Sequence, residues 1–240
     1  MKFSYLLPNS CNITFIALVF ITPLIFSCKP NLSIYPEIID GDGVVDAEGN
    51  FYPTAIYGDQ EWMSENLKTS LYCNGDTIPY LGENKKWVIY DNDPINDSLF
   101  GKLYLYGAIY DTANICPCGW RVPTDADFAK FNNYLGGLYD ALPLLKDGGR
   151  LGQGDGLWND NYSAQVDGRS LHFKALPAGY AIGIGTMEYK KKDTLTRFWL
   201  NYPNDNGEGK NFRIGQFQYV ELETFDFKWI YASVRCIKDY

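Results

Sequence analysis

The stretch that decides the fold of this chain is Ile115-Cys116-Pro117-Cys118-Gly119-Trp120-Arg121-Val122-Pro123-Thr124-Asp125. It holds two cysteines on either side of a single proline, and it ends in residues typical of a helix start. A second stretch, Ser233-Val234-Arg235-Cys236, lies near the end of the sequence. Together the two stretches bracket one compact domain.

The clearest secondary-structure signal is a helix that begins at Thr124. The sequence Thr124-Asp125-Ala126-Asp127 fits a capping box, in which the first and fourth side chains each bond the backbone N–H of the other residue. Phe128, Phe131 and Leu135 then follow on one apolar face. Gly136-Gly137 supplies a stop. We therefore predict an amphipathic helix that ends at these glycines.

Weaker patterns indicate the remaining elements. Asn50 to Ile56 has strand composition, and Tyr139 to Lys146 fits a second helix that Pro143 would disturb. After Gly148, glycine-rich loops alternate with short aromatic stretches that predict strands at residues 172–180, 196–201, 212–221 and 228–237. Helices early in the chain and strands late predict the α+β class rather than alternating βαβ units.

Cysteine positions limit the disulfides. Outside the N-terminal segment the sequence has four cysteines, Cys73, Cys116, Cys118 and Cys236. In an exported protein these can oxidise, and four cysteines allow three pairings. A Cys116–Cys118 bridge would close a very tight ring across Pro117, which disulfide geometry disfavours. Two pairings remain, and both join the middle of the chain to Cys236.

The N-terminus has the pattern of a bacterial lipoprotein signal. Lys2 precedes an apolar run from Phe15 to Phe26 of about 12 residues, whereas a membrane-spanning helix needs about 20. Ser27 supplies the small residue before the cleavage site, and Cys28 supplies the thiol that would carry a lipid. The alternative is an ordinary signal peptide followed by a coincidental cysteine.

This pattern divides the chain into a signal peptide at residues 1–27, a tether at 28–43 and a domain at 44–240. We expect a protein of the bacterial cell envelope, lipid-anchored at the outer membrane through Cys28. The sequence Lys29-Pro30-Asn31 lacks the acidic run that often marks surface export, which favours the periplasmic side. The net charge of −8 argues against nucleic acid as a partner and against a polybasic membrane patch.

Few residues could carry catalysis. His172 is the single histidine, which excludes HExxH and multi-histidine zinc sites, and it lies at the edge of a predicted strand. One residue separates Cys116 from Cys118, whereas redox cysteine pairs usually have two residues between them. We therefore expect no enzyme activity and no cofactor.

Two sets of residues are weak candidates for binding a ligand. Asp40, Asp42 and Asp46 offer hard oxygen ligands for calcium, but the terminal bidentate Glu of a calcium loop is missing, so a solvated acidic turn is favoured. Tryptophans that flank predicted loops could stack on a sugar, although ordinary core packing is the competing interpretation. These are Trp87 and Trp158, followed by Trp199 and Trp229.

Seven short motifs, taken in order, resemble the Fibrobacter succinogenes major paralogous domain family. They include Glu61-Trp62-Met63-Ser64-Glu65-Asn66-Leu67-Lys68-Thr69, residues 116–128, Phe173-Lys174-Ala175-Leu176-Pro177-Ala178-Gly179-Tyr180 and residues 233–239. The resemblance extends over about residues 44–240. The family looks related to the C-type-lectin-like and formylglycine-generating-enzyme fold. That relation implies an α+β domain with two early helices, long irregular loops and a late antiparallel sheet.

The resemblance also implies the disulfide pairing. The family's cysteines correspond to Cys116 and Cys236, which leaves Cys73 and Cys118 as a second pair. No activity is attached to the family, so the resemblance implies a fold and not a reaction. We expect a non-catalytic, lectin-like binding domain whose ligand is an unknown glycan or envelope protein. The alternatives are an enzyme of the formylglycine-generating type and a structural component of a surface appendage.

Overall fold

The computed structural model describes residues 36–82, 85–137, 145–147, 157–158, 172–184, 186–202, 208–215, 220–225 and 229–240 of the 240-residue chain. The chain separates into two units, Met1–Leu32 and Ser33–Tyr240, and all described residues belong to the second. The predicted signal peptide, Cys28 and the first part of the predicted tether lie outside the described residues. Within those residues, no helix is long and apolar enough to cross a membrane.

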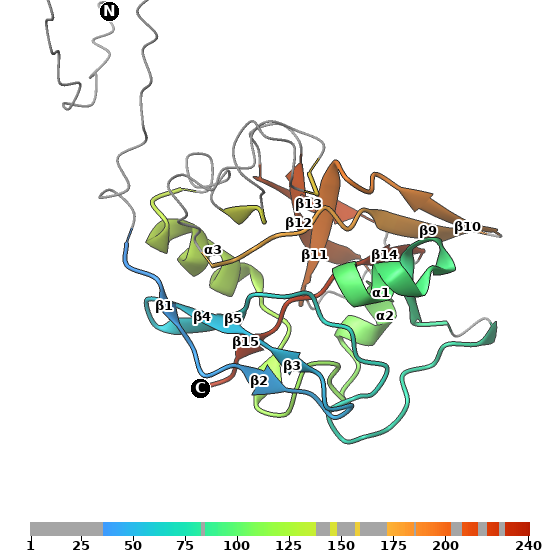
Figure 1. Ribbon diagram of the computed structural model, residues 1–240, viewed down its shortest axis with the longest axis horizontal. Helices are drawn as coiled ribbons and strands as arrows, with labels where there is room; N and C mark the ends of the chain where they lie inside the picture. The colour runs from blue at the N-terminus through green and yellow to red at the C-terminus, as the bar shows by residue number, and fades with distance from the viewer. Residues whose placement is uncertain are drawn as a thin grey trace, which may run out of the picture. The chain divides into compact units, whose positions relative to one another are not determined.

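The first sheet has five antiparallel strands, and the last strand of the chain lies in its interior (Figure 1). In spatial order they are β1 (Ile39–Asp40), β4 (Thr54–Tyr57), β5 (Gln60–Met63), β15 (Ile237–Lys238) and β8 (Trp120–Arg121). Ile237 pairs with Trp62 on one side and with Arg121 on the other. The Gly-Trp turn and the final strand are therefore direct neighbours.

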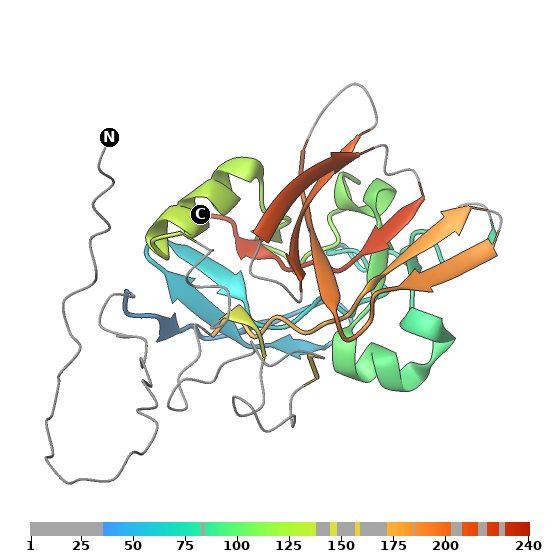
Figure 2. The ribbon, with the colours of Figure 1, turned by 90° about the horizontal axis from the view of Figure 1, so that it is seen from above.

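The described residues form three more antiparallel sheets. One has the order β10 (Thr186–Lys190), β9 (Tyr180–Ile184), β14 (Ile230–Ala232), β7 (Leu103–Leu105) and β6 (Trp87–Val88). Another has β11 (Leu195–Leu200), β12 (Gly209–Gly215) and β13 (Val220–Phe225), and the smallest pairs β2 (Val44–Val45) with β3 (Phe51–Tyr52). In Figure 2 the orange hairpin of β9 and β10 extends to one side of the domain.

Three short α-helices accompany these sheets in the described part of the chain: α1 (Pro94–Phe100), α2 (Tyr106–Ile109) and α3 (Asp125–Tyr134). A 3-10 helix, η3 (Tyr90–Asn92), precedes α1. The helix predicted at Thr124 is confirmed as α3, with both hydrogen bonds of the capping box between Thr124 and Asp127. Short helices among mostly antiparallel strands agree with the predicted α+β class.

The apolar face of α3 joins two sheets through aromatic contacts. The ring centroid of Phe131 lies 4.8 Å from that of Tyr57 and 5.0 Å from that of Trp62, both in the first sheet. Phe128 stacks on Phe212 of β12 at 4.6 Å. Burying such a ring stabilises the fold by roughly 2–3 kcal/mol. The face predicted from sequence therefore holds α3 between the first and the three-stranded sheet.

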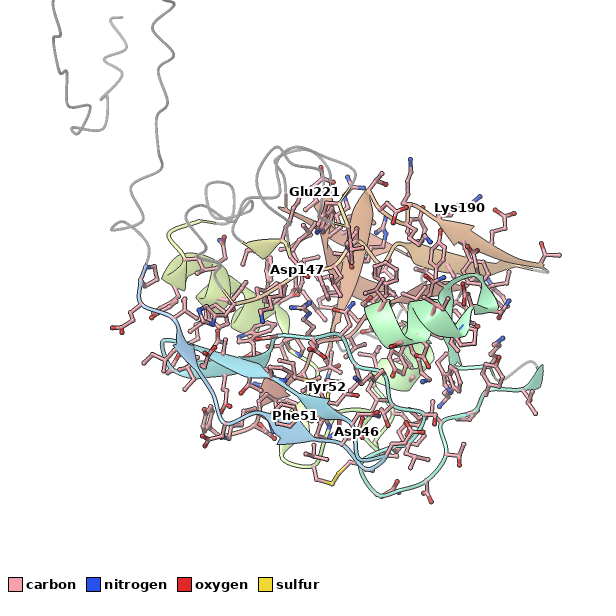
Figure 3. The ribbon with its side chains drawn as sticks, in the orientation of Figure 1. Asp46, Phe51, Tyr52, Asp147, Lys190 and Glu221 are labelled. Carbon is pink, nitrogen blue, oxygen red and sulfur yellow. A yellow bond between two sulfur atoms is a disulfide. The ribbon has the colours of Figure 1, made fainter. Side chains whose placement is uncertain are left out.

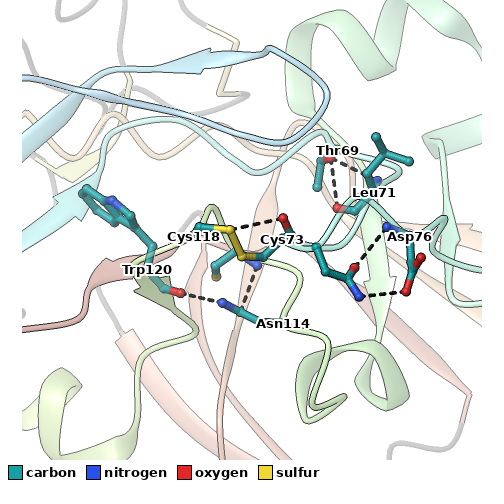
Figure 4. Close-up of a disulfide and its surroundings, with 9 residues drawn as sticks. Thr69, Leu71, Cys73, Asp76, Asn114, Cys118 and Trp120 are labelled. Carbon is teal, nitrogen blue, oxygen red and sulfur yellow. Dashed lines mark hydrogen bonds between the residues drawn. A yellow bond between two sulfur atoms is a disulfide. The ribbon is translucent and has the colours of Figure 1, made fainter.

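Both disulfides implied by the resemblance are present. Cys116 bonds Cys236 with a Cα–Cα distance of 5.9 Å, and Cys73 bonds Cys118 at 5.1 Å, both within the usual range. The first bridge is completely buried, whereas Cys118 is exposed at the surface. Figure 4 shows the second bridge, where the backbone N–H of Cys73 also donates to the carbonyl of Asn114. One disulfide therefore lies inside the core, and the other lies at the protein surface.

Three predicted elements differ in the structure. Residues 172–179 are not a strand, because His172 and Lys174 have positive φ angles of 59° and 47°, and only Tyr180 begins β9. The strand predicted at 212–221 is two paired strands, β12 and β13, with the reversal between them. The strand predicted at 50–56 is divided into β3 and β4 at Pro53. The predicted helix from Tyr139 to Lys146 lies almost entirely outside the described residues.

Candidate functional site

A cavity of about 570 Å³ lies beside the start of α3 and the end of β15. We call it the α3–β15 cavity. Three segments far apart in sequence build it: the turn between β4 and β5, the residues of β8 and α3, and the end of the chain. Its lining residues are Ile56, Gly58, Asp59, Gln60, Arg121, Asp127, Lys130, Ile237, Lys238, Asp239 and Tyr240.

A tight turn forms one rim of this cavity. Tyr57 and Gln60 pair across the β4–β5 hairpin, which leaves Gly58 and Asp59 as its two turn residues. Gly58 has a φ of +67°, the left-handed conformation that a type II′ hairpin turn requires at its first position. The turn presents Asp59 to Lys130 of α3, whose Nζ lies 2.5 Å from Oδ2. An exposed ion pair therefore links the hairpin to the helix beside the cavity.

Arg121 connects the helix to the end of the chain. Its Nη1 and Nη2 donate to the two carboxylate oxygens of Asp127, at 2.6 Å and 3.1 Å. Its Nε donates to Oδ1 of Asp239 at 3.1 Å. A guanidinium that meets a carboxylate through two parallel bonds has a fixed orientation, so the arginine presents a defined polar wall.

Hydrogen bonds shift the pKa values of three groups that line this cavity. Burial alone would raise the pKa of Asp127, but hydrogen bonds from Arg121 and Thr124 outweigh it and lower this pKa to about 2. The hydrogen bond to Asp127 raises the pKa of Arg121. The hydrogen bond to Glu61 likewise raises the pKa of Lys238. Perturbed pKa values gather at functional sites more often than elsewhere, which makes this cavity a candidate.

We predict that Asp127→Asn lowers the free energy of unfolding at pH 7 by about 2 kcal/mol. The folded-state pKa of Asp127 lies below its ordinary value of 3.8, so the ionised form stabilises the fold above that pH. This stability is lost as the pH falls from about 4 to about 2. Urea unfolding at several acidic pH values should show a shallower dependence in the variant. Asp239→Asn, a more exposed partner of Arg121, is the control and should change stability by less than about 1 kcal/mol.

The side chains that line the cavity carry equal numbers of positive and negative charges. Three side chains are acidic and three are basic: Asp59, Asp127 and Asp239 against Arg121, Lys130 and Lys238. Tyr240 stands beside them with 83% of its surface exposed, whereas the Gln60 amide is buried, donates to the Asp127 carbonyl and accepts from the Trp62 ring N–H. The charged side chains are paired within the protein, and Nζ of Lys238 lies 5.7 Å from the centroid of the largely exposed Tyr240 ring. Their remaining lone pairs and N–H groups can still bond a hydroxyl group, and the ring adds an apolar surface. The arrangement suits an uncharged ligand rich in hydroxyl groups.

A family model for the Fibrobacter succinogenes major domain matches residues 56–238. The chain belongs to this family. The matched residues include both disulfides and every residue that lines the α3–β15 cavity except Asp239 and Tyr240. A search of curated proteins found no match, and a search of solved structures found none either.

Within this family domain, the two tryptophans predicted to stack on a sugar are core residues, and that prediction is wrong. Trp87 is 9% exposed and Trp158 is 4% exposed. Each ring N–H donates to a main-chain carbonyl, that of Ile78 at 3.2 Å for Trp87 and that of Ala175 at 2.8 Å for Trp158. Neither ring has a free face for a ligand. Trp199 is buried too, and among the six tryptophans, all of them described, only Trp229 is exposed, at 53%.

The weak calcium candidates Asp40, Asp42 and Asp46 do not assemble a metal site. The carboxylate of Asp46 accepts hydrogen bonds from the backbone of Glu48 and Asn50, both at 2.9 Å, and from the Tyr52 hydroxyl at 2.6 Å. Figure 3 shows Asp46 and Tyr52 close together. Asp40 meets Nδ1 of His172 at 2.6 Å. No group of three or more possible metal ligands occurs among the described residues.

The α3–β15 cavity was not predicted from the sequence, although its parts carried signals. Arg121 lies in the stretch that decides the fold, and Asp127 is the fourth residue of the predicted capping box. Lys238 and Asp239 lie two and three positions after the last cysteine. No sequence pattern predicted that β15 pairs with β8, and this pairing brings the charged side chains to one place.

Proposed function

We propose that this protein is a lipid-anchored component of the bacterial cell envelope, whose C-type-lectin-like domain binds a neutral glycan in the α3–β15 cavity without catalysing a reaction. The single observation that carries the proposal is the cavity itself. It combines an exposed aromatic ring, Tyr240, with charge-balanced planar groups held by the Arg121 network. Sugars are bound by such rings through their C–H faces and by such planar groups through their hydroxyls.

The proposed location rests on the N-terminal sequence. An apolar run that is too short to span a bilayer ends at Ser27-Cys28. Two disulfides in the described domain support exposure to an oxidising compartment outside the cytoplasm. Lipid on Cys28 and the periplasmic side of the outer membrane remain part of this proposal.

The lectin-like architecture is supported by the α+β fold and by the bridge from Cys116 to the final strand. The alternative of a formylglycine-generating-type enzyme is disfavoured by the same bridge. Such enzymes use a cysteine pair near their C-terminal end, whereas here Cys236 is already bonded to Cys116 in the core.

A printed array of neutral oligosaccharides, probed with the purified full chain, tests the proposed ligand class. We expect binding to at least one neutral glycan, and we expect Tyr240→Ala to weaken it about tenfold, because one ring contact contributes about 1 kcal/mol or more. Titration calorimetry with that glycan supplies the dissociation constants. Tyr110→Ala is the matched control, since Tyr110 is an exposed tyrosine that lines none of the described cavities. Equal losses in both variants, or no glycan bound, would refute the proposal.

A further inference from the structure

A second, elongated depression runs along α1, away from the α3–β15 cavity. It consists of two adjoining cavities of about 410 Å³ and 450 Å³, which share Lys68 and Ser98 in their linings. Residues of α1 form one wall and the segment 64–68 forms the other. We call this feature the α1 groove. Its two-lobed shape suits an extended ligand better than a compact one.

The walls of the α1 groove are tightly joined to the core. Nζ of Lys102 donates to the carbonyl of Lys68 at 2.6 Å and pairs with Asp97 of α1 at 3.0 Å. Gly101 ends α1 with a φ of +72°, and a side chain there would come within 2.6 Å of the Leu67 carbonyl. A glycine is therefore required where the helix meets segment 64–68. These contacts give the groove a preformed geometry.

Arg235 supports the groove from inside the protein. Its side chain is fully buried, its Nε donates to Asn66 at 2.9 Å and its guanidinium also donates to the carbonyls of Phe173 and Lys174. Asn66 and Lys174 line the groove. The buried arginine thus fixes both segments that close one end of the groove.

Charged side chains of both signs line this groove and make no close ion pair among the residues that the structure describes, although the buried Arg235 attracts Glu65 and Asp147 from inside the protein. Glu65 and Asp147 are the acidic members, and Lys68 and Lys174 are the basic members. Nζ of Lys68 lies 5.6 Å from the centroid of the Tyr52 ring. Figure 3 shows Asp147 lying apart from the other labelled acidic residues. The remaining charged lining residues, Glu48, Asp97 and Lys102, are bonded within the protein.

An apolar stripe borders the groove. Ile95 and Leu99 are one helical turn apart on α1, and they are 71% and 42% exposed. Leu99 also lines the groove, with Leu176. Two exposed aliphatic side chains on one face of a short helix favour contact with another apolar surface. No tyrosine or tryptophan ring lines the groove in the described part of the chain.

We propose that the α1 groove is a docking site for an extended segment of a partner polypeptide that carries aliphatic, acidic and basic side chains close together. Its aliphatic side chain packs on Leu99 and Ile95. Its basic side chain faces Glu65 and Asp147, and its acidic side chain faces Lys68 and Lys174. A polypeptide presents both signs of charge at spacings of a few ångströms, whereas a neutral glycan presents neither. The site and the ligand class differ from those of the α3–β15 cavity.

A phage-displayed library of linear dodecapeptides, selected on the purified full chain, tests this proposal. We expect enriched peptides that combine an aliphatic residue with both signs of charge. Fluorescence anisotropy with a synthetic peptide from the selection should show binding at least about tenfold weaker for Leu99→Asp, because an apolar contact is lost and a carboxylate is desolvated. The double variant Glu65→Gln/Asp147→Asn should bind peptides that contain a basic residue more weakly than the wild-type chain does. Added salt should weaken binding to the wild-type chain.

Leu81→Asp is the matched control, since Leu81 is an exposed leucine that lines none of the described cavities. It should leave peptide binding unchanged, as should Tyr240→Ala in the other cavity. Thermal unfolding of each variant reports whether it is folded. The proposal is wrong if no peptide is enriched, if Leu99→Asp and Leu81→Asp bind equally, or if the groove variants lose binding to a glycan instead.

Discussion

Replacing Cys116 and Cys236 together by alanine is expected to lower the free energy of unfolding by about 5 kcal/mol, which is much of the stability of an ordinary domain. The bridge joins residues 120 positions apart, so breaking it returns a large amount of conformational freedom to the unfolded chain. Both cysteines are completely buried in the core, so the variant also loses packing. Urea unfolding of the full chain, compared with wild type, measures the loss.

The Cys73→Ala/Cys118→Ala variant is the comparison for this measurement. Its bridge spans 45 positions, which gives about 4 kcal/mol in the same chain-entropy estimate and no buried packing loss. A mild reductant should open this bridge first in the native protein, because Cys118 is exposed and Cys236 is buried. Alkylation and peptide mass spectrometry identify the reduced pair. Reduction of Cys116–Cys236 before Cys73–Cys118 would contradict the assignment of core and edge bridges.

Raising the pH above 10 should lower the free energy of unfolding by at least about 3 kcal/mol for each pH unit. Burial raises the pKa of Tyr52, Tyr57 and Tyr104 far above 10, with donation to Asp46 raising that of Tyr52 further. Below pH 10 these tyrosines are protonated in both states and contribute no pH dependence. Above pH 10 only the unfolded chain releases their protons, so each costs about 1.4 kcal/mol of stability per pH unit.

The deprotonation of Arg235 makes the folded state more stable as the pH rises, which opposes the effect of the tyrosines. Burial lowers its pKa to about 9, so between pH 9 and its ordinary value of 12.5 the folded protein releases its proton more readily. The stability that Arg235 adds per pH unit offsets the loss from about one of the three tyrosines. The free energy of unfolding therefore still falls as the pH rises.

Denaturant unfolding at a series of pH values measures the slope, and tyrosinate absorbance reports ionisation. The Tyr57→Phe variant should show a slope shallower by about 1.4 kcal/mol per pH unit. An unchanged slope would contradict the assignment of Tyr57 as a tyrosine that ionises only on unfolding.

Local sequence rules predicted the parts of the fold that depend on neighbouring residues. The capping box at Thr124 and the apolar face of Phe128 and Phe131 are set by the spacing within one helix, and both occur in α3. Local rules failed where distant contacts override them. His172 and Lys174 adopt positive φ angles in a segment with strand composition, and there the carbonyls of Phe173 and Lys174 accept from the buried Arg235. That arginine lies far away in sequence, so no local pattern reveals it.

The candidate site was less predictable than the fold for a related reason. Burial of Trp87 and Trp158 depends on which loops cover them, and a tryptophan beside a loop has the same local sequence whether it is covered or free. The α3–β15 cavity needs the pairing of Ile237 with Arg121, a contact between residues on opposite sides of a long intervening chain. The resemblance to the family implied the Cys116–Cys236 bridge, which lies close to this strand pair, but it did not indicate that charged residues gather there.

The interior position of β15 has a consequence for biogenesis. The first sheet cannot close until Ile237 occupies the place between Trp62 and Arg121, so the edges of β5 and β8 stay unpaired until the residues around Ile237 have been synthesised. Contacts so remote along the chain slow folding. Completion of this one strand is therefore the step at which the first sheet acquires its native pairing.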